Sequence, residues 1–142
     1  MSDARGLGAW NAITDQTGID ELLTLFGNFH DACIREIHVV TGTYVQENLS
    51  MTVNSKTTLH MLVQRQSRQL SAIELRAEEL VALRLEIPPP DHENIIYSAL
   101  LFIRDGTIYW IPNGWLDSEP PEDGTWIAAR KLSWREASVG SG

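Results

Sequence analysis

The chain has 142 residues, of which 43% are hydrophobic and 21% charged, so it can bury the core of one domain and is not wholly disordered. Its nineteen acidic and eleven basic residues give a net charge of −8, which argues against binding to nucleic acid, itself densely negative. The single Cys33 excludes an internal disulfide, and no apolar run reaches the length of a membrane span. We therefore expect a cytoplasmic protein without a signal peptide and without membrane contact.

The first part of the chain predicts a helix followed by strands. Residues 1–16 are weakly periodic and are expected to form an extended arm. A helix is predicted to start at Thr17, because Ile19, Leu22 and Phe26 share one face, and Gly27 ends it. Strands are predicted at 33–41, 44–45, 49–53 and 57–66. Cys33 opens the first of them and is interpreted as a small core residue.

Residues 71–87 carry two conflicting patterns. The run Ser71-Ala72-Ile73-Glu74 resembles a capping box, and the Ala- and Glu-rich residues after it favour a helix. Alternation of apolar residues instead indicates two strands joined by a tight turn or bulge near Glu78. We prefer the strands, but the helix remains an alternative at this stage.

The second half predicts strands separated by turns. Prolines 88–90 require a surface connection, and residues 95–104, apolar on both faces, are typical of a central buried strand. Asp105-Gly106 predicts a hairpin that returns over 107–111. The last strand is predicted at 125–135, with Trp126 and Trp134 on its inward face together with Ala128, Arg130 and Leu132. Residues 137–142 are expected to be disordered.

Together these elements predict one mainly β domain over residues 17–136. We expect an antiparallel sandwich or bent half-barrel of about seven to nine strands with one N-terminal helix.

Three stretches resemble a family of small uncharacterised bacterial proteins. They are the Phe29-His30-Asp31 turn, the hairpin at 101–110 and the Gly- and Trp-containing strand at 124–135. The Phe-His-Asp turn also resembles the opening of several β-rich immunity proteins from bacterial toxin systems. The resemblance covers about 22–135; it implies an all-β fold, including strands over 72–87, and it carries no enzymatic activity.

His30 and Asp31 are the first candidates for chemistry, as a general base and its orienting carboxylate. Adjacent residues rarely adopt that geometry, and no nucleophile is fixed by spacing. We therefore interpret Phe29, His30 and Asp31 as a structural turn at the junction of helix and strand.

A metal site could be assembled from His38 and His60 with Glu36 or Asp31, since imidazole and carboxylate groups bind zinc. The spacing matches no metal-binding motif. We therefore predict neither a metal nor another cofactor.

The segment from residue 109 to residue 126 combines tryptophans with carboxylates. Such a combination can form a recognition surface with aromatic anchors inside a charged rim. The residues assigned to this partner-binding surface are Trp110, Trp115, Asp117, Glu119, Glu122 and Asp123. The alternative is that the tryptophans close one end of the β core while the acidic loop is merely solvated.

The sequence thus favours a non-enzymatic, immunity-like protein-interaction module that presents an acidic and aromatic surface to a basic protein. The competing hypothesis is a small-ligand-binding protein or hydrolase-like enzyme that uses His30, Asp31, His38 and His60. Convergence of these four side chains in one pocket would favour the second hypothesis.

Overall fold

The computed structural model describes residues 4–53, 56–91, 94–114 and 122–139, which form nine strands and one α-helix. The mainly β, antiparallel fold with a single helix near the N-terminus is therefore confirmed. The elements are β1 (Ala4–Ile13), α1 (Gln16–Leu25), a 3-10 turn (Gly27–Phe29), β2 (Ala32–Val40), β3 (Tyr44–Val45), β4 (Met51–Thr52), β5 (Thr58–Arg65), β6 (Ala72–Arg84), β7 (Ala99–Arg104), β8 (Thr107–Pro112) and β9 (Trp126–Val139).

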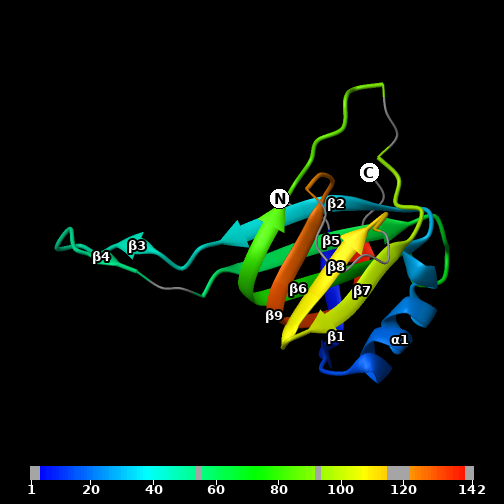
Figure 1. Ribbon diagram of the computed structural model, residues 1–142, viewed down its shortest axis with the longest axis horizontal. Helices are drawn as coiled ribbons and strands as arrows, with labels where there is room; N and C mark the ends of the chain where they lie inside the picture. Colours follow the sequence, from blue (N-terminus) through cyan, green and yellow to red (C-terminus); the bar gives the residue numbers. More distant parts are fainter. Residues whose placement is uncertain (1–3, 54–55, 92–93, 115–121, 140–142) are drawn as a thin grey trace.

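Seven of the strands form one antiparallel sheet that bends around the core (Figure 1). Its order is β2-β5-β6-β9-β8-β7, and β1 also pairs with β9. β9 therefore has β6 along one edge and two different strands, β8 and β1, along the other. The sheet is not closed, although a single antiparallel bridge between Ala32 and Ile96 joins its two ends.

Helix α1 begins at a side-chain cap and packs on the sheet through one apolar face. The Asp15 carboxylate accepts a hydrogen bond from the Gly18 N–H at 3.0 Å, which satisfies one of the free donors of the first turn. Ile19 and Leu22 are buried, and the helix contacts β1 and β7. The helix is short, so this packing is what stabilises it.

The core centres on three aromatic rings that come from different parts of the chain. Phe29 lies edge-to-face with Phe26 at 5.1 Å and with Trp110 at 5.4 Å between ring centroids. All three side chains are completely buried. The inward residues of β5 and β6 pack around them: Leu59, Met61, Val63, Ile73 and Leu75.

Residues 72–84 form one long strand, β6, so the helical alternative is wrong and the β interpretation is confirmed, with a bulge rather than a turn. The register shifts between Leu80 and Ala82, and Glu79 has a positive φ of 52°. β6 is paired on both edges, with β5 and with β9. These long-range pairings outweigh the local helix propensity of the segment.

The last strand faces the core differently from the prediction. Trp134 and Leu132 are buried in the core as predicted, whereas Trp126 is only half-buried and Arg130 is exposed. The inward residues of the first half are Ile127 and Ala129, which the sequence analysis had placed outside. Along β9 the inward residues change from odd numbers (127, 129) to even numbers (132, 134) opposite Glu79 of β6, where the backbone is left-handed and alternation is reset.

Both ends of the described chain are more ordered than the sequence predicts. Residues 4–13, expected to belong to an extended arm, form β1, and β9 continues to Val139 into the predicted disordered tail. The two segments pair with each other, from Ala4 opposite Val139 to Ile13 opposite Leu132. A register shift between Leu7 and Asn11 interrupts the alternation of β1, which explains its weak periodicity.

Two further predictions are wrong in β2 and β7. Cys33 is exposed rather than in the core, because a register shift between Ile34 and Glu36 lets Ile34 and Ile37 pack inward instead. The segment predicted to be a central strand starts later, at Ala99, and β7 lies at the edge of the sheet. Its partner β8, rather than β7, carries the buried Trp110.

A two-stranded hairpin extends away from this body (Figure 1). β3 and β4 pair only with each other, Tyr44 opposite Thr52 and Val45 opposite Met51. The turn is closed by hydrogen bonds from Gln46 N–H to the Ser50 carbonyl at 2.8 Å and from Leu49 N–H to the Gln46 carbonyl at 2.9 Å. We call residues 41–53 the β-arm.

Candidate functional site

The Phe-His-Asp turn links three segments of the chain. Phe29 is anchored in the core, and the His30 Nδ1 lies 2.8 Å from the carbonyl oxygen of Tyr97, just before β7. The backbone is left-handed at Phe29 (φ 62°) and Asp31 (φ 58°), which turns the chain sharply into β2. These contacts are those of a structural junction next to the bridge between Ala32 and Ile96.

The His30 ring also lies beside the Asp31 carboxylate, with 3.5 Å between Nε2 and Oδ2. Both side chains are about half exposed, at 64% and 46%. An exposed ion pair of this kind contributes little to stability because water screens it. With one ring nitrogen at the Tyr97 carbonyl and the other at Asp31, the imidazole is oriented by contacts within this junction.

The other two candidate histidines form a separate pair on the outer face of the sheet. His38 of β2 lies directly opposite His60 of β5. Burial lowers the pKa of His60 below its ordinary value of 6.5; the negative charge of Glu74 opposes this, and the positive charges of Arg76 and Arg135 add to it, as does His38. The Trp10 ring lies edge-to-face with the imidazole of His60, with 6.2 Å between centroids.

The four candidate residues do not converge on one pocket. His30 and Asp31 precede β2, whereas His38 lies near its other end. At the rise of a strand these positions are about 20 Å apart. Among the described residues, no group of three or more His, Cys, Asp or Glu side chains is arranged to hold a metal ion.

The structure separates the residues of the predicted acidic and aromatic surface. Trp110 is completely buried, so it is a core residue and not a surface anchor. Its position among tryptophans and carboxylates had suggested a recognition surface, but the ring packs against Phe29. Trp115, Asp117 and Glu119 lie outside the described residues. Glu122 and Asp123 are exposed just before β9.

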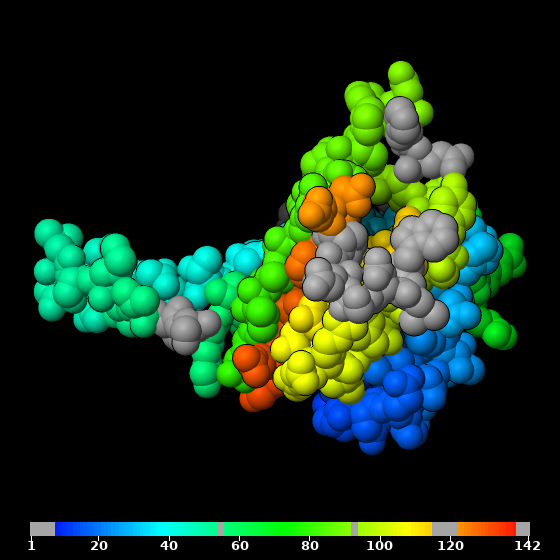
Figure 2. All heavy atoms as spheres, in the orientation of Figure 1, coloured from blue at the N-terminus to red at the C-terminus, as the bar shows by residue number. Residues whose placement is uncertain are grey.

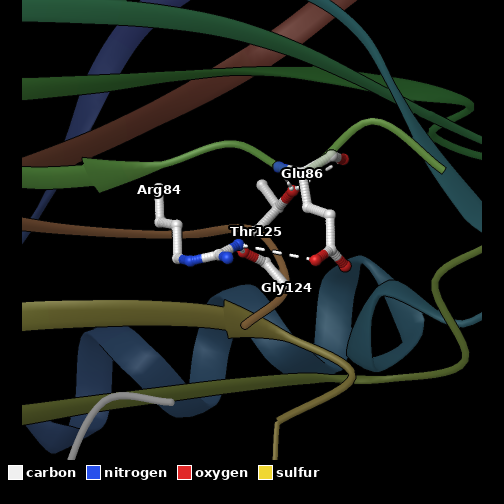
Figure 3. Close-up of polar contacts among 4 residues, drawn as sticks. All are labelled: Arg84, Glu86, Gly124 and Thr125. Carbon is white, nitrogen blue, oxygen red and sulfur yellow. Dashed lines mark hydrogen bonds and ion pairs between the residues drawn. The ribbon is translucent and has the colours of Figure 1, made fainter. Parts of the chain in front are cut away.

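The chain that leads from these two carboxylates into β9 is tied to the end of β6 (Figure 3). Arg84 donates a hydrogen bond to the Gly124 carbonyl at 2.7 Å and lies 3.7 Å from the Glu86 carboxylate. The Glu86 N–H donates to the Thr125 hydroxyl at 3.0 Å. Glu122 and Asp123 therefore directly precede residues that are hydrogen-bonded to the end of β6.

The β-arm carries exposed apolar side chains that the sequence analysis did not single out. Leu49 is 83% exposed and Val53 78%, and Tyr44, Val45 and Met51 are 57–63% exposed. Figure 2 shows the β-arm standing clear of the body. One sequence signal could have identified it: Glu47 is the only charged residue between positions 41 and 53, which is unusual for an exposed turn.

No protein-family model matches the chain, and neither a curated protein nor a solved structure is significantly similar to it. The resemblance of the Phe-His-Asp turn to immunity proteins therefore stays a prediction. Within the described residues, no helix is long and apolar enough to cross a membrane.

Proposed function

We propose that this protein is a non-enzymatic protein-interaction module whose principal binding element is the β-arm and whose partner is a basic protein. The observation that carries the proposal is the exposure of large apolar side chains on a hairpin that contacts little of its own body. Exposed apolar residues gathered on one element, rather than scattered singly, are typical of interaction sites.

The shape of the β-arm supports binding by insertion or strand addition. Only two residue pairs join β3 to β4, and both outer edges of this ribbon lack a neighbouring strand among the described residues. Free edges can pair with a strand of another protein, while alternate side chains enter its pockets. A short two-stranded ribbon is only marginally stable alone, so docking would also stabilise it.

The charge of the chain supports a basic partner. The net charge of −8 attracts a positively charged protein over long distances and raises its association rate at low salt. The β-arm itself is nearly uncharged, so its apolar contacts can be desolvated without burying unpaired charges. His30 and Asp31 lie far from His38 and His60, and this separation supports an interaction module rather than a hydrolase.

The proposal can be tested by affinity capture from cells that encode the protein, with three baits compared side by side. They are the wild-type chain, the triple variant Tyr44→Ser, Leu49→Ser, Met51→Ser, and the matched body variant Val81→Ser, Leu83→Ser, Leu85→Ser. The body variant removes three apolar side chains from β6 and the residue after it that are also exposed. We expect one protein to be retained by the wild type and the body variant but lost by the β-arm variant.

Binding of the purified candidate is then measured against salt. A basic partner should associate more slowly as ionic strength increases, because salt screens long-range attraction. The proposal fails if the β6 variant, and not the β-arm variant, loses the partner. It also fails if sedimentation shows that the β-arm serves only to associate two copies of this chain.

A further inference from the structure

A groove of about 490 Å³ opens where β9 changes partners along one edge. β8 pairs with residues 127–129 of β9, and β1 pairs with residues 132–139. Arg130 and Lys131 lie in the interval and pair with neither strand on this side. The groove is thus a seam between the end of β1 and the hairpin of β7 and β8, far in sequence from the β-arm.

The floor of the groove is apolar. Ile13 of β1, Ile108 of β8 and Leu132 of β9 line it, and all three belong to the hydrophobic core. Ile103 of β7 adds an exposed apolar side chain at the margin. A cavity of this size lies in the range that holds small molecules, about 300–1,000 Å³, and such sites are mostly apolar with a few polar groups.

The charge of the groove is opposite in sign to the charge of the protein. Arg76, Arg130 and Lys131 line it, against a single carboxylate, Glu78. Three of the eleven basic residues of the chain thus gather at one site. Positive charge concentrated in a depression with apolar walls attracts small anions.

Two of the three cations already have partners. Arg76 Nε lies 3.3 Å from the Glu78 carboxylate and donates to the Ser133 hydroxyl at 3.2 Å, and Lys131 Nζ lies 3.5 Å from Glu79. Arg130 is exposed and has no ion pair or hydrogen bond within the described part of the chain. Its guanidinium is therefore available to bind a carboxylate through two parallel hydrogen bonds, as a bidentate pair.

Trp10 forms a fixed wall of the groove. Its ring contacts two guanidinium groups, that of Arg76 at 4.2 Å and that of Arg135 at 4.3 Å from the ring centroid. Arg135 is held in turn by Glu74 at 3.2 Å. Because these contacts come from side chains of the chain itself, they hold the Trp10 wall in place, and little ordering accompanies binding.

We propose that this groove binds a small amphipathic organic anion, namely an alkyl or aryl monocarboxylate. The apolar body of the ligand lies against Ile13, Ile108 and Leu132, and its carboxylate pairs with Arg130. This combination selects against a neutral apolar molecule, which leaves Arg130 unpaired, and against a bare inorganic anion, which makes no use of the floor. The site is independent of the β-arm.

Octanoate and octanol are suitable probes, since they share an alkyl chain and differ in charge. Binding is followed by calorimetry and by the indole N–H signal of Trp10 in ¹H–¹⁵N spectra, identified by its loss in Trp10→Phe. We expect octanoate to shift this signal and to bind at least about tenfold more tightly than octanol.

Three variants separate the contributions. Arg130→Gln should weaken octanoate about tenfold and leave octanol unchanged, because it removes the charge and keeps the size of the side chain. Ile103→Glu, at an exposed position, should repel octanoate from the groove. Arg68→Gln, an exposed cation outside the groove, is the matched control and should bind normally. The inference is overturned if saturating octanoate leaves the Trp10 signal unmoved, if octanol binds as tightly, or if Arg130→Gln binds octanoate as well as the wild type.

Discussion

The body and the β-arm contain similar apolar residues, which are buried in the body and exposed in the β-arm. In the body, Phe26, Phe29 and Trp110 are completely buried and hold the helix, the Phe-His-Asp turn and β8 together. In the β-arm, Leu49 and Val53 are almost fully exposed to water. Burial provides the main free energy of folding, so only the first set stabilises the fold.

This difference in burial shows at which positions a residue can change without loss of the fold. Replacing an exposed apolar residue leaves the folded state nearly unchanged, whereas replacing a buried one creates a cavity. The exposed apolar residues of the β-arm therefore contribute little to the stability of the fold. Four predictions can break or sharpen this contrast.

The largest effect is expected for Trp110→Ala. Removing a fully buried indole should lower the free energy of unfolding by about 3–5 kcal/mol, through lost burial and the cavity that remains. Urea denaturation measures this change. Leu49→Ala in the β-arm is the control and should cost less than about 0.5 kcal/mol. Equal losses in the two variants would erase the distinction between body and β-arm.

A smaller contrast is expected within β9. Trp134 is 7% exposed and belongs to the core, so Trp134→Ala should also cost about 3 kcal/mol or more. Trp126 is half-buried, and Trp126→Ala should cost clearly less. Parallel guanidinium melts compare the two. Equal losses of unfolding free energy in the two variants would mean that the inward face of β9 does not switch from odd to even residues opposite Glu79.

His30→Ala should lower the free energy of unfolding by about 1 kcal/mol, since the contact of its ring with the Tyr97 carbonyl is lost. Asp31→Gly is a suitable companion, because glycine accepts the φ of 58° and the ion pair is exposed. It should be nearly neutral in the same urea melts. An unchanged midpoint for His30→Ala would contradict a structural role for this ring.

The smallest effect is a pH dependence at the row of outward residues beneath Trp10. The folded pKa of His60 lies below 6.5, so between that lowered value and 6.5 the unfolded chain binds protons more strongly than the folded chain. Stability should therefore increase as pH rises through this window. Comparing urea midpoints at about pH 5 and about pH 8 tests it, and His60→Gln should remove this part of the change. A wild-type midpoint that falls over the same interval would have the wrong sign.

Sequence patterns predicted most elements but not their faces. Alternation located β5, the Asp105-Gly106 turn located β8, and the apolar face at Ile19 located α1, because these signals depend on neighbouring residues. The faces of β2, β6 and β9 depend on bulges near Arg35, Glu79 and Arg130, which arise from pairing between distant strands. Residues on the two sides of such an irregularity follow opposite alternation, as the inward pairs Ile34 and Ile37 in β2 and Ile127 and Leu132 in β9 illustrate.

The candidate sites were harder to predict for the same reason. Trp110 was interpreted as a surface anchor because its segment combines tryptophans with carboxylates, whereas its burial depends on Phe29, more than seventy positions earlier in the chain. The groove at Arg130 exists only because β1 and β8 share an edge of β9. Neither residue is marked by a local motif.

The position of β9 at the centre of the sheet has a consequence for how the chain acquires its fold. β9 follows the other eight strands in sequence, yet β6, β8 and β1 all pair with it. The pairing of Ala4 with Val139 encloses almost the whole described chain in one loop. Closing a large loop costs entropy before its contacts form, and this slows folding. During synthesis β1 has no partner strand until β9 is made, while the hairpins form locally. The sheet is completed only once β9 has left the ribosome, so folding of this domain ends after translation of its last strand rather than during it.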